Sequence, residues 1–158
     1  MQRIAVELRP SVLDALGLPA AIRDEARRFE ARTGVVSSVE TSTSAAPGPA
    51  VATALFRILQ ELLTNAARHA QASSLHITLA DEPAAWVMRV RDNGVGIPVE
   101  MTGRGRVSSL GLLGMIERAE AIGGAFRVER HSDGGTLATV TIPRPPDSES
   151  RHATRSDR

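Results

Sequence analysis

Four polar side chains of different chemistry occur within one short stretch of the sequence. Glu61, Asn65, Arg68 and His69 stand at i, i+4, i+7 and i+8, so on an α-helix they would share one face. Helix surfaces commonly carry scattered Glu and Arg, but an Asn in an interior turn lowers helix propensity because its amide competes for backbone hydrogen bonds. The face is therefore either a functional site or an ordinary solvated surface.

A second group pairs a carboxylate with glycines. Asp92, Gly94 and Gly96 alternate directly after a predicted strand. Glycines let a backbone approach a ligand closely, and the Asp could accept hydrogen bonds from an exocyclic amine. A β-turn is the alternative, since Asp-Asn-Gly is a typical turn sequence. The Gly-Gly-Thr run that ends at Thr136 is a weaker signal, which a hairpin turn explains.

Glycines also open a predicted helix. The run Gly111, Leu112, Leu113, Gly114 and Met115 stands at its start. The first turn of a helix offers free N–H groups and a positive dipole end to an anion. A loop-to-helix junction that needs small residues is the alternative explanation.

The elements that must position these residues follow from hydrophobic periodicity and turn signals. A central helix is predicted at 55–70, and Leu55, Leu59, Leu62, Leu63 and Ala66 form its apolar face. A short apolar turn is expected at 11–18, and further helices at 20–33 and 110–122. Strands are expected at 35–40, 75–79, 86–90, 125–130 and 136–142. The pattern predicts a two-layer α+β sandwich, in which about three helices cover one face of a mixed, mostly antiparallel sheet.

Composition narrows the chemistry. The 158-residue chain is long enough for one domain, and with three Phe, one Trp and no Tyr its core must be aliphatic. The absence of Cys excludes thiolate chemistry and disulfides, and the absence of Lys excludes a P-loop lysine. The net charge of +1 with scattered Arg predicts no nucleic-acid surface, and no apolar run approaches the roughly 20 residues of a membrane span.

Taken together, the order and spacing of these groups resemble the ATP-binding catalytic domain of sensor histidine kinases. That superfamily also includes gyrase, the heat-shock chaperone and the mismatch-repair ATPases. The stretch Phe56–Ala70 is similar to the pattern Phe-Arg-Ile-x-Gln-Glu-x-x-Thr-Asn-x-x-Arg-His-Ala of the nitrate/nitrite-sensor-like kinases. Segments 8–10, 13–18 and 32–34 also look like that family, so the resemblance runs from about Leu8 to Pro143 and implies a Bergerat-type fold.

The resemblance implies that the chain binds ATP and Mg²⁺. Asn65 would bind the metal through its amide oxygen, a ligand type that suits a hard cation. Glu61 would orient a Mg-bound water or help to take a proton. Arg68 and His69 would face the phosphates.

The same resemblance places the adenine beside Asp92. The Asp92 carboxylate would accept a hydrogen bond from the N6 amine and so make the site selective for adenine over guanine. Gly94 and Gly96 would admit the base, and Thr136 would support Asp92 through a water. The remaining nucleotide contacts would come from the glycine-rich helix start: Gly111, Leu112, Gly114 and Met115. Segment 99–109 would be a lid, in which Arg104 and Arg106 either contact phosphates or lie in a solvated loop.

The phosphoacceptor histidine of such kinases lies in an acidic motif on an upstream dimerising hairpin. None of the four His here, at 69, 76, 131 and 152, stands in such a motif. The implied activity is therefore transfer of the γ-phosphate to a histidine on a separate dimerisation and phosphoacceptor domain, with a response regulator as further partner. Two alternatives are a serine kinase of the anti-sigma-factor type and a nucleotide-sensing module without turnover.

The expected organisation has three parts. Residues 1–10 would end an upstream dimerisation helix or linker, 11–143 would form the ATP-binding catalytic domain, and 144–158 would be a disordered tail. Without the hairpin, the domain is expected to be a monomer. A cytoplasmic location is expected, with no membrane contact in this chain and the parent protein either soluble or membrane-anchored.

Overall fold

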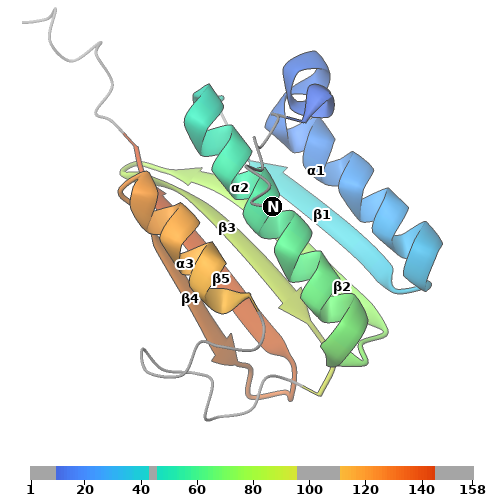
Figure 1. The fold of residues 1–158 in the computed structure, drawn as a ribbon. Helices are drawn as coiled ribbons and strands as arrows, with labels where there is room; N and C mark the ends of the chain where they lie inside the picture. The colour runs from blue at the N-terminus through green and yellow to red at the C-terminus, as the bar shows by residue number, and fades with distance from the viewer. Residues whose placement is uncertain (1–9, 43–45, 96–110, 145–158) are drawn as a thin grey trace, which may run out of the picture.

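The computed structural model describes residues 10–42, 46–95 and 111–144. The predicted lid at 99–109, Gly96 and most of the two terminal segments lie outside the described residues. Within them, five strands form one sheet in the order β1-β2-β3-β5-β4, and three helices cover one face of it (Figure 1). The predicted two-layer α+β architecture is confirmed.

The sheet is mixed because one pair of strands is parallel. β1 (Val36–Ser42) runs parallel to β2 (Ser74–Glu82), and the intervening chain crosses over through the central helix. β3 (Ala85–Asp92), β5 (Thr136–Pro143) and β4 (Ala125–Arg130) complete the sheet with antiparallel pairing. The β2–β3 ladder ends at the pair Leu75–Asp92, which brings the last residue of β3 to the beginning of β2.

Each helix end has a local cause. α1 (Ser11–Thr33) contains a break at Gly17, where φ is 78°, just before Pro19, so it consists of the predicted short turn and the longer helix after it. Gly34 ends it in a left-handed cap at φ 78°. α2 (Pro49–Asn65) begins on a proline, which suits a first turn because its missing N–H would have no partner there. α3 (Leu112–Ala121) follows Gly111.

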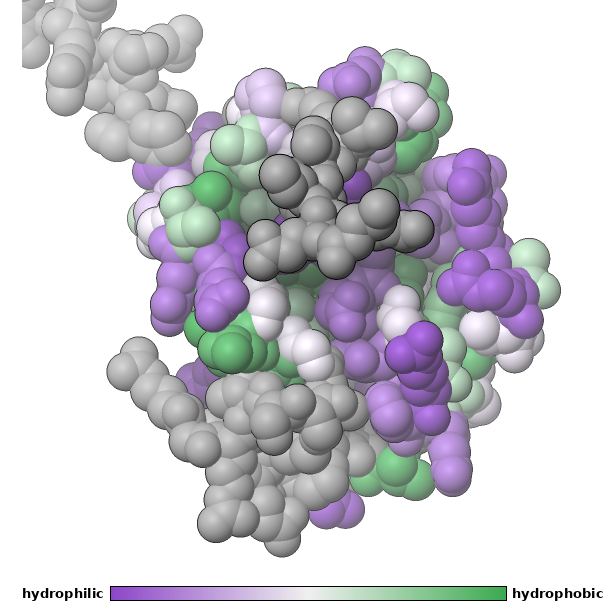
Figure 2. Space-filling view, viewed as in Figure 1, coloured by the Kyte–Doolittle hydropathy of each residue, from purple (hydrophilic) through white to green (hydrophobic). Residues whose placement is uncertain are grey.

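The core lies between the helices and the sheet and is mostly aliphatic, although Phe29, Phe56 and Trp86 are also buried in it. The predicted apolar face of the central helix is buried at Leu55, Leu59, Leu62 and Leu63, and Ala66 packs against it half-buried. Burying such a side chain contributes about 1.5–3 kcal/mol, so this face holds the central helix on the sheet. Figure 2 shows the opposite character along the outer side of α1, where hydrophilic side chains gather. None of the described helices combines the length and apolarity that crossing a membrane requires.

The central helix differs from its prediction at both ends. It begins at Pro49 rather than Leu55, because the Pro and Gly residues of the preceding loop form its cap. Residues 66–70 form a π-helical turn, η1 (Ala66–Ala70), which ends at Gln71 in a left-handed conformation (φ 50°, ψ 40°). The prediction of a continuous α-helix through Ala70 was therefore wrong: the α-helix ends at Asn65, and Arg68 and His69 stand on the π turn that follows it.

Candidate functional site

The end of the central helix carries the first group of predicted residues. Glu61 is exposed and Asn65, one turn later, is half-buried as the last residue of α2. Arg68 and His69 are exposed on the π turn. Single π turns inside or at the end of α-helices are frequent at functional sites. The structure thus presents a carboxylate and an amide at one helix end, followed by two exposed basic side chains.

The central helix meets the glycine-rich start of α3 at Glu61. Gly111 has φ +66°, and a Cβ on it would lie 2.6 Å from Glu61 Oε1, so the backbone of Gly111 is in contact with this carboxylate. A side chain at this position would be strained by its dihedral angles, and it would displace the Glu61 carboxylate from its present place. In Figure 1 the C-terminal end of α2, the end of β3 and the start of α3 all lie at the lower end of the molecule. Two of the predicted groups, 50 positions apart in sequence, are therefore brought together.

The first turn of α3 divides into buried and open positions. Leu112 and Met115 are 5% and 1% exposed and belong to the core. The N–H of Met115 donates to Gly111 O at 3.2 Å, so it is engaged within the helix. Gly114 is exposed, and a Cβ built on it would meet nothing within 4 Å. The described structure therefore gives no packing reason for a glycine at this helical position, where Ala is favoured by about 1 kcal/mol.

Asp92 ends β3, and its carboxylate organises the turn after it. Oδ1 accepts hydrogen bonds from the N–H of Gly94 at 2.9 Å and of Thr136 at 3.4 Å. Thr136 therefore reaches Asp92 directly through its backbone, whereas the predicted contact ran through a water. Within the described part of the chain both bonds end on Oδ1, which leaves Oδ2 able to accept from a ligand.

The turn between β4 and β5 packs tightly against the same residue. A Cβ on buried Gly135 would clash with the backbone of Asp92, lying 2.8 Å from its carbonyl carbon and closer still to the oxygen. Only glycine permits this approach. The Gly-Gly-Thr run, a weak signal in the sequence, therefore has a definite structural role. It seats β5 beside Asp92, so that the Thr136 N–H reaches the carboxylate.

Sequence reasoning missed two features of this end of the molecule. Asn93, which looked like an ordinary turn residue, joins β3 to the segment before β2 through both atoms of its amide. Val95 and Leu113 are each 54% exposed, and they are two of the four large apolar side chains exposed among the described residues. They stand next to Gly94 and Gly114. Apolar side chains beside polar groups are typical of small-molecule sites, and their neighbouring glycines were the available signal.

The donor set at the end of α2 bears on whether a metal would fit. No cluster of three or more His, Asp or Glu able to hold a metal occurs among the described residues. Mg²⁺ retains several waters and is commonly bound by one or two protein oxygens together with substrate phosphates. The amide oxygen of Asn65 and the carboxylate of Glu61, one helical turn apart, therefore fit a Mg²⁺ bound jointly with phosphates. They do not fit an all-protein metal centre.

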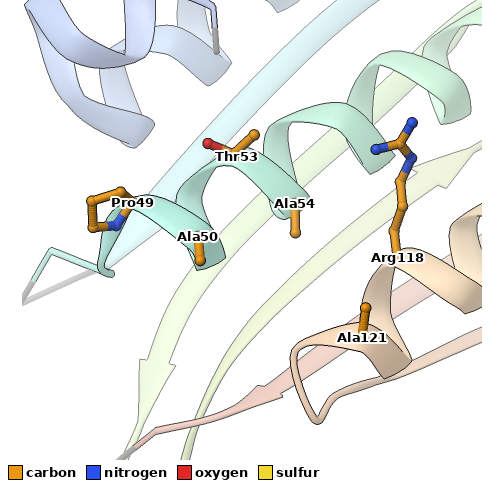
Figure 3. A pocket seen from close by; sticks show the side chains of 6 residues that line it. All are labelled: Pro49, Ala50, Thr53, Ala54, Arg118 and Ala121. Atoms are coloured by element: carbon orange, nitrogen blue, oxygen red, sulfur yellow. The ribbon is translucent and has the colours of Figure 1, made fainter. Parts of the chain in front are cut away.

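A cavity of about 430 Å³ lies elsewhere, between the first turns of α2 and the last turns of α3. Figure 3 shows Thr53 and Ala54 on one side and Ala121 on the other, with Arg118 reaching toward α2. Because α2 and α3 run in opposite directions, this is the far end of their shared groove from Glu61 and Gly111. The cavity contains none of the predicted site residues.

Comparison with known proteins identifies the family of the chain. Residues 50–146 match the family model described as histidine kinase-, DNA gyrase B-, and HSP90-like ATPase. The chain is 35% identical over 144 residues to the oxygen sensor histidine kinase NreB of Staphylococcus carnosus, covering 90% of this chain and 41% of that protein. It is 37% identical over 145 residues to the sensor histidine kinase MctS of Rhizobium johnstonii, covering 91% and 31%. The chain thus spans less than half the length of these curated relatives.

Among solved structures, the catalytic domain of histidine kinase ThkA superposes with a TM-score of 0.64 at 22% identity, covering 82% of this chain and 95% of that one. That likeness concerns the fold, and the sequence relationships above carry the assignment. The chain belongs to the family of histidine kinase-, DNA gyrase B- and HSP90-like ATPases.

Proposed function

We propose that this chain binds Mg-ATP at the end of α2 and donates the γ-phosphate to a histidine on a separate dimerisation and phosphoacceptor domain. The observation that carries the proposal is the contact between the Glu61 carboxylate and the backbone of Gly111. It joins the polar end of the central helix to a glycine-rich helix start, which is where a phosphate chain would need both metal ligands and N–H donors.

The phosphate end of the nucleotide would lie against α2 and α3. Asn65 would hold Mg²⁺ through its amide oxygen, and Glu61 would orient a metal-bound water or take a proton. When bound, the metal offsets the negative charge that the phosphates carry. Gly114 leaves open space at the helix start, which a phosphate could occupy. Arg68 and His69 are exposed beside this end, and Arg68 would add positive charge.

The adenine end would lie against β3 and β5. Asp92 would accept a hydrogen bond from the N6 amine through Oδ2, since Oδ1 is engaged by the Gly94 and Thr136 amides. A hydrogen bond to a charged group is worth about 1.5–3 kcal/mol. Guanine has no amine at that position and would leave the carboxylate without this partner. Val95 would provide apolar surface next to the base.

In the transfer step, an imidazole nitrogen of the acceptor forms a bond to the γ-phosphorus while the bond from that phosphorus to the β–γ bridging oxygen breaks. ADP leaves, and the nitrogen's proton passes to a base, for which Glu61 is the candidate on this chain. Such a transfer needs placement and charge neutralisation more than covalent chemistry from the protein. We place this activity in the cytoplasm, within a two-component phosphorelay that ends on a response regulator.

The test is to mix the chain with a separately produced acceptor hairpin of its kinase and with ATP labelled on the γ-phosphate. Label that is acid-labile and base-stable on the hairpin supports histidine transfer. Acid-stable label on a protein substrate would instead indicate a serine kinase of the anti-sigma-factor type. Intact Mg-ATP binding without any transfer would leave a nucleotide-sensing module, and absence of binding would refute the proposal altogether.

A further inference from the structure

The side chain of Asn93 joins two segments that lie 20 residues apart in sequence. Its Oδ1 accepts hydrogen bonds from the backbone N–H groups of Ser73 and Ser74, both at 2.9 Å, and its Nδ2 donates to Ser73 Oγ at 2.8 Å. Two N–H donors face one atom of the amide and a hydroxyl faces the other, so the partners determine its orientation. The N–H of Asn93 also donates to Ser74 O at 3.3 Å.

The two joined segments belong to different halves of the candidate site. Residues 71–74 leave the π turn that follows Asn65, and they begin at Gln71 in its left-handed conformation. Asn93 itself directly follows Asp92. Because the β2–β3 ladder ends at the pair Leu75–Asp92, the amide of Asn93 continues the connection one step beyond the sheet. It thereby links the end of the helix that carries Asn65 to the end of the strand that carries Asp92.

Asp92 has a separate attachment on its other side. The Thr136 amide and the close approach of Gly135 tie it to β5, and these contacts involve the backbone but not the side chain of Asn93. Loss of the Asn93 amide would therefore leave Asp92 seated on β5, whereas the chain that leaves α2 would lose its side-chain tie to the end of β3. That chain would keep its backbone bonds, among them the one that the Val36 N–H donates to Ser73 O at 3.0 Å. The contacts are exposed to solvent, so each contributes little to the stability of the fold.

We infer that Asn93 is a positioning residue that sets the spacing between the Asn65 side and the Asp92 side of the site. The inference rests on the function proposed above. A ligand that occupies both sides depends on that spacing, because binding energy from one end is realised only if the other end is in place. A ligand that occupies the adenine side alone depends on Asp92 and β5, and hence not on Asn93.

The experiment compares Mg-ATP with adenosine as ligands of the chain and its variants by calorimetry and by NMR titration. Asn93→Ala should weaken the binding of Mg-ATP about tenfold, which is an ordinary size for the coupling between two parts of a site. It should change the affinity for adenosine by less than about twofold. Asn93→Asp keeps an acceptor oxygen for the two backbone N–H groups, so it should bind Mg-ATP more tightly than Asn93→Ala. Thr41→Ala removes another exposed side-chain hydrogen bond, the one that Arg23 donates to Thr41 Oγ1 outside the candidate site, and serves as the matched control, with both affinities close to those of the unmodified chain.

The outcomes separate the inference from the proposed function. Mg-ATP affinity that is unchanged in Asn93→Ala, or adenosine affinity that falls as much as Mg-ATP affinity, would overturn the positioning role. An unfolding midpoint that falls in parallel with affinity, or failure of Asn93→Ala to fold, would overturn it too, because Asn93 would then be a structural residue. If the unmodified chain binds neither ligand, the proposed function itself fails.

Discussion

Replacing Gly114 by alanine should make the protein more stable and a poorer nucleotide binder at the same time. Gly114 is exposed in the first turn of α3, has no positive φ, and would carry a Cβ with nothing within 4 Å. Alanine in a helix is favoured over glycine by about 0.5–1 kcal/mol, chiefly because the unfolded chain loses less freedom. For a domain of this size 1 kcal/mol shifts Tm by roughly 2–4 °C, so Tm should rise by about 1–4 °C.

The same methyl group would stand where the phosphates are proposed to lie. We expect Gly114→Ala to weaken Mg-ATP by at least about tenfold, equivalent to about 1.4 kcal/mol. Stability is measured by thermal unfolding followed through Trp86, the only tryptophan, which is 6% exposed in the folded protein. Affinity is measured by calorimetry with Mg-ATP.

Gly123→Ala is the matched control at the other end of the same helix. Gly123 has φ +77° and open space around its Cβ position, so alanine there should cost about 1–2 kcal/mol through backbone strain alone. Mg-ATP affinity should be unchanged. The two variants should thus change stability in opposite directions, and only Gly114→Ala should lower the affinity for Mg-ATP. The reasoning is refuted if Gly114→Ala binds Mg-ATP within twofold of the unmodified chain, or if its unfolding midpoint falls.

Three further substitutions test other parts of the site. Asn65→Ala should abolish Mg-dependent transfer while part of the nucleotide affinity remains, and undiminished transfer to the acceptor hairpin would remove Asn65 from its role as metal ligand. Asp92→Asn should weaken ATP binding by about 1.5–3 kcal/mol, because a charge-assisted bond is lost, and should lower the free energy of unfolding, measured in urea, by much less. Equal ATP affinity by calorimetry would exclude Asp92 from the site. Gly135→Ala should destabilise the fold by about 1–3 kcal/mol, since its Cβ would clash with the Asp92 backbone, and a thermal melt unchanged within a degree would contradict that contact.

Much of the fold could be read from local pattern. Alternation predicted all five strands, and the spacing of Leu55, Leu59 and Leu62 predicted the buried face of the central helix, because burial on one side imposes a period on the sequence. The ends of elements were harder. Pro49 begins α2 six residues before its predicted start, and the π turn at 66–70 replaces the predicted α-helical turn, since both depend on backbone geometry that no hydrophobic period reports.

The chemistry of the site is a property of the sequence, because residue types and motif order alone indicate a carboxylate, an amide and glycine-rich turns that suit a nucleotide. Their assembly is a property of the tertiary structure. Three contacts each join segments at least 19 residues apart in sequence: Glu61 with Gly111, Gly135 with Asp92, and the bridge made by Asn93. Such contacts arise only when helices and strands pack. The sequence therefore determined which chemical groups the site could contain, and tertiary packing determined which of these groups lie next to one another.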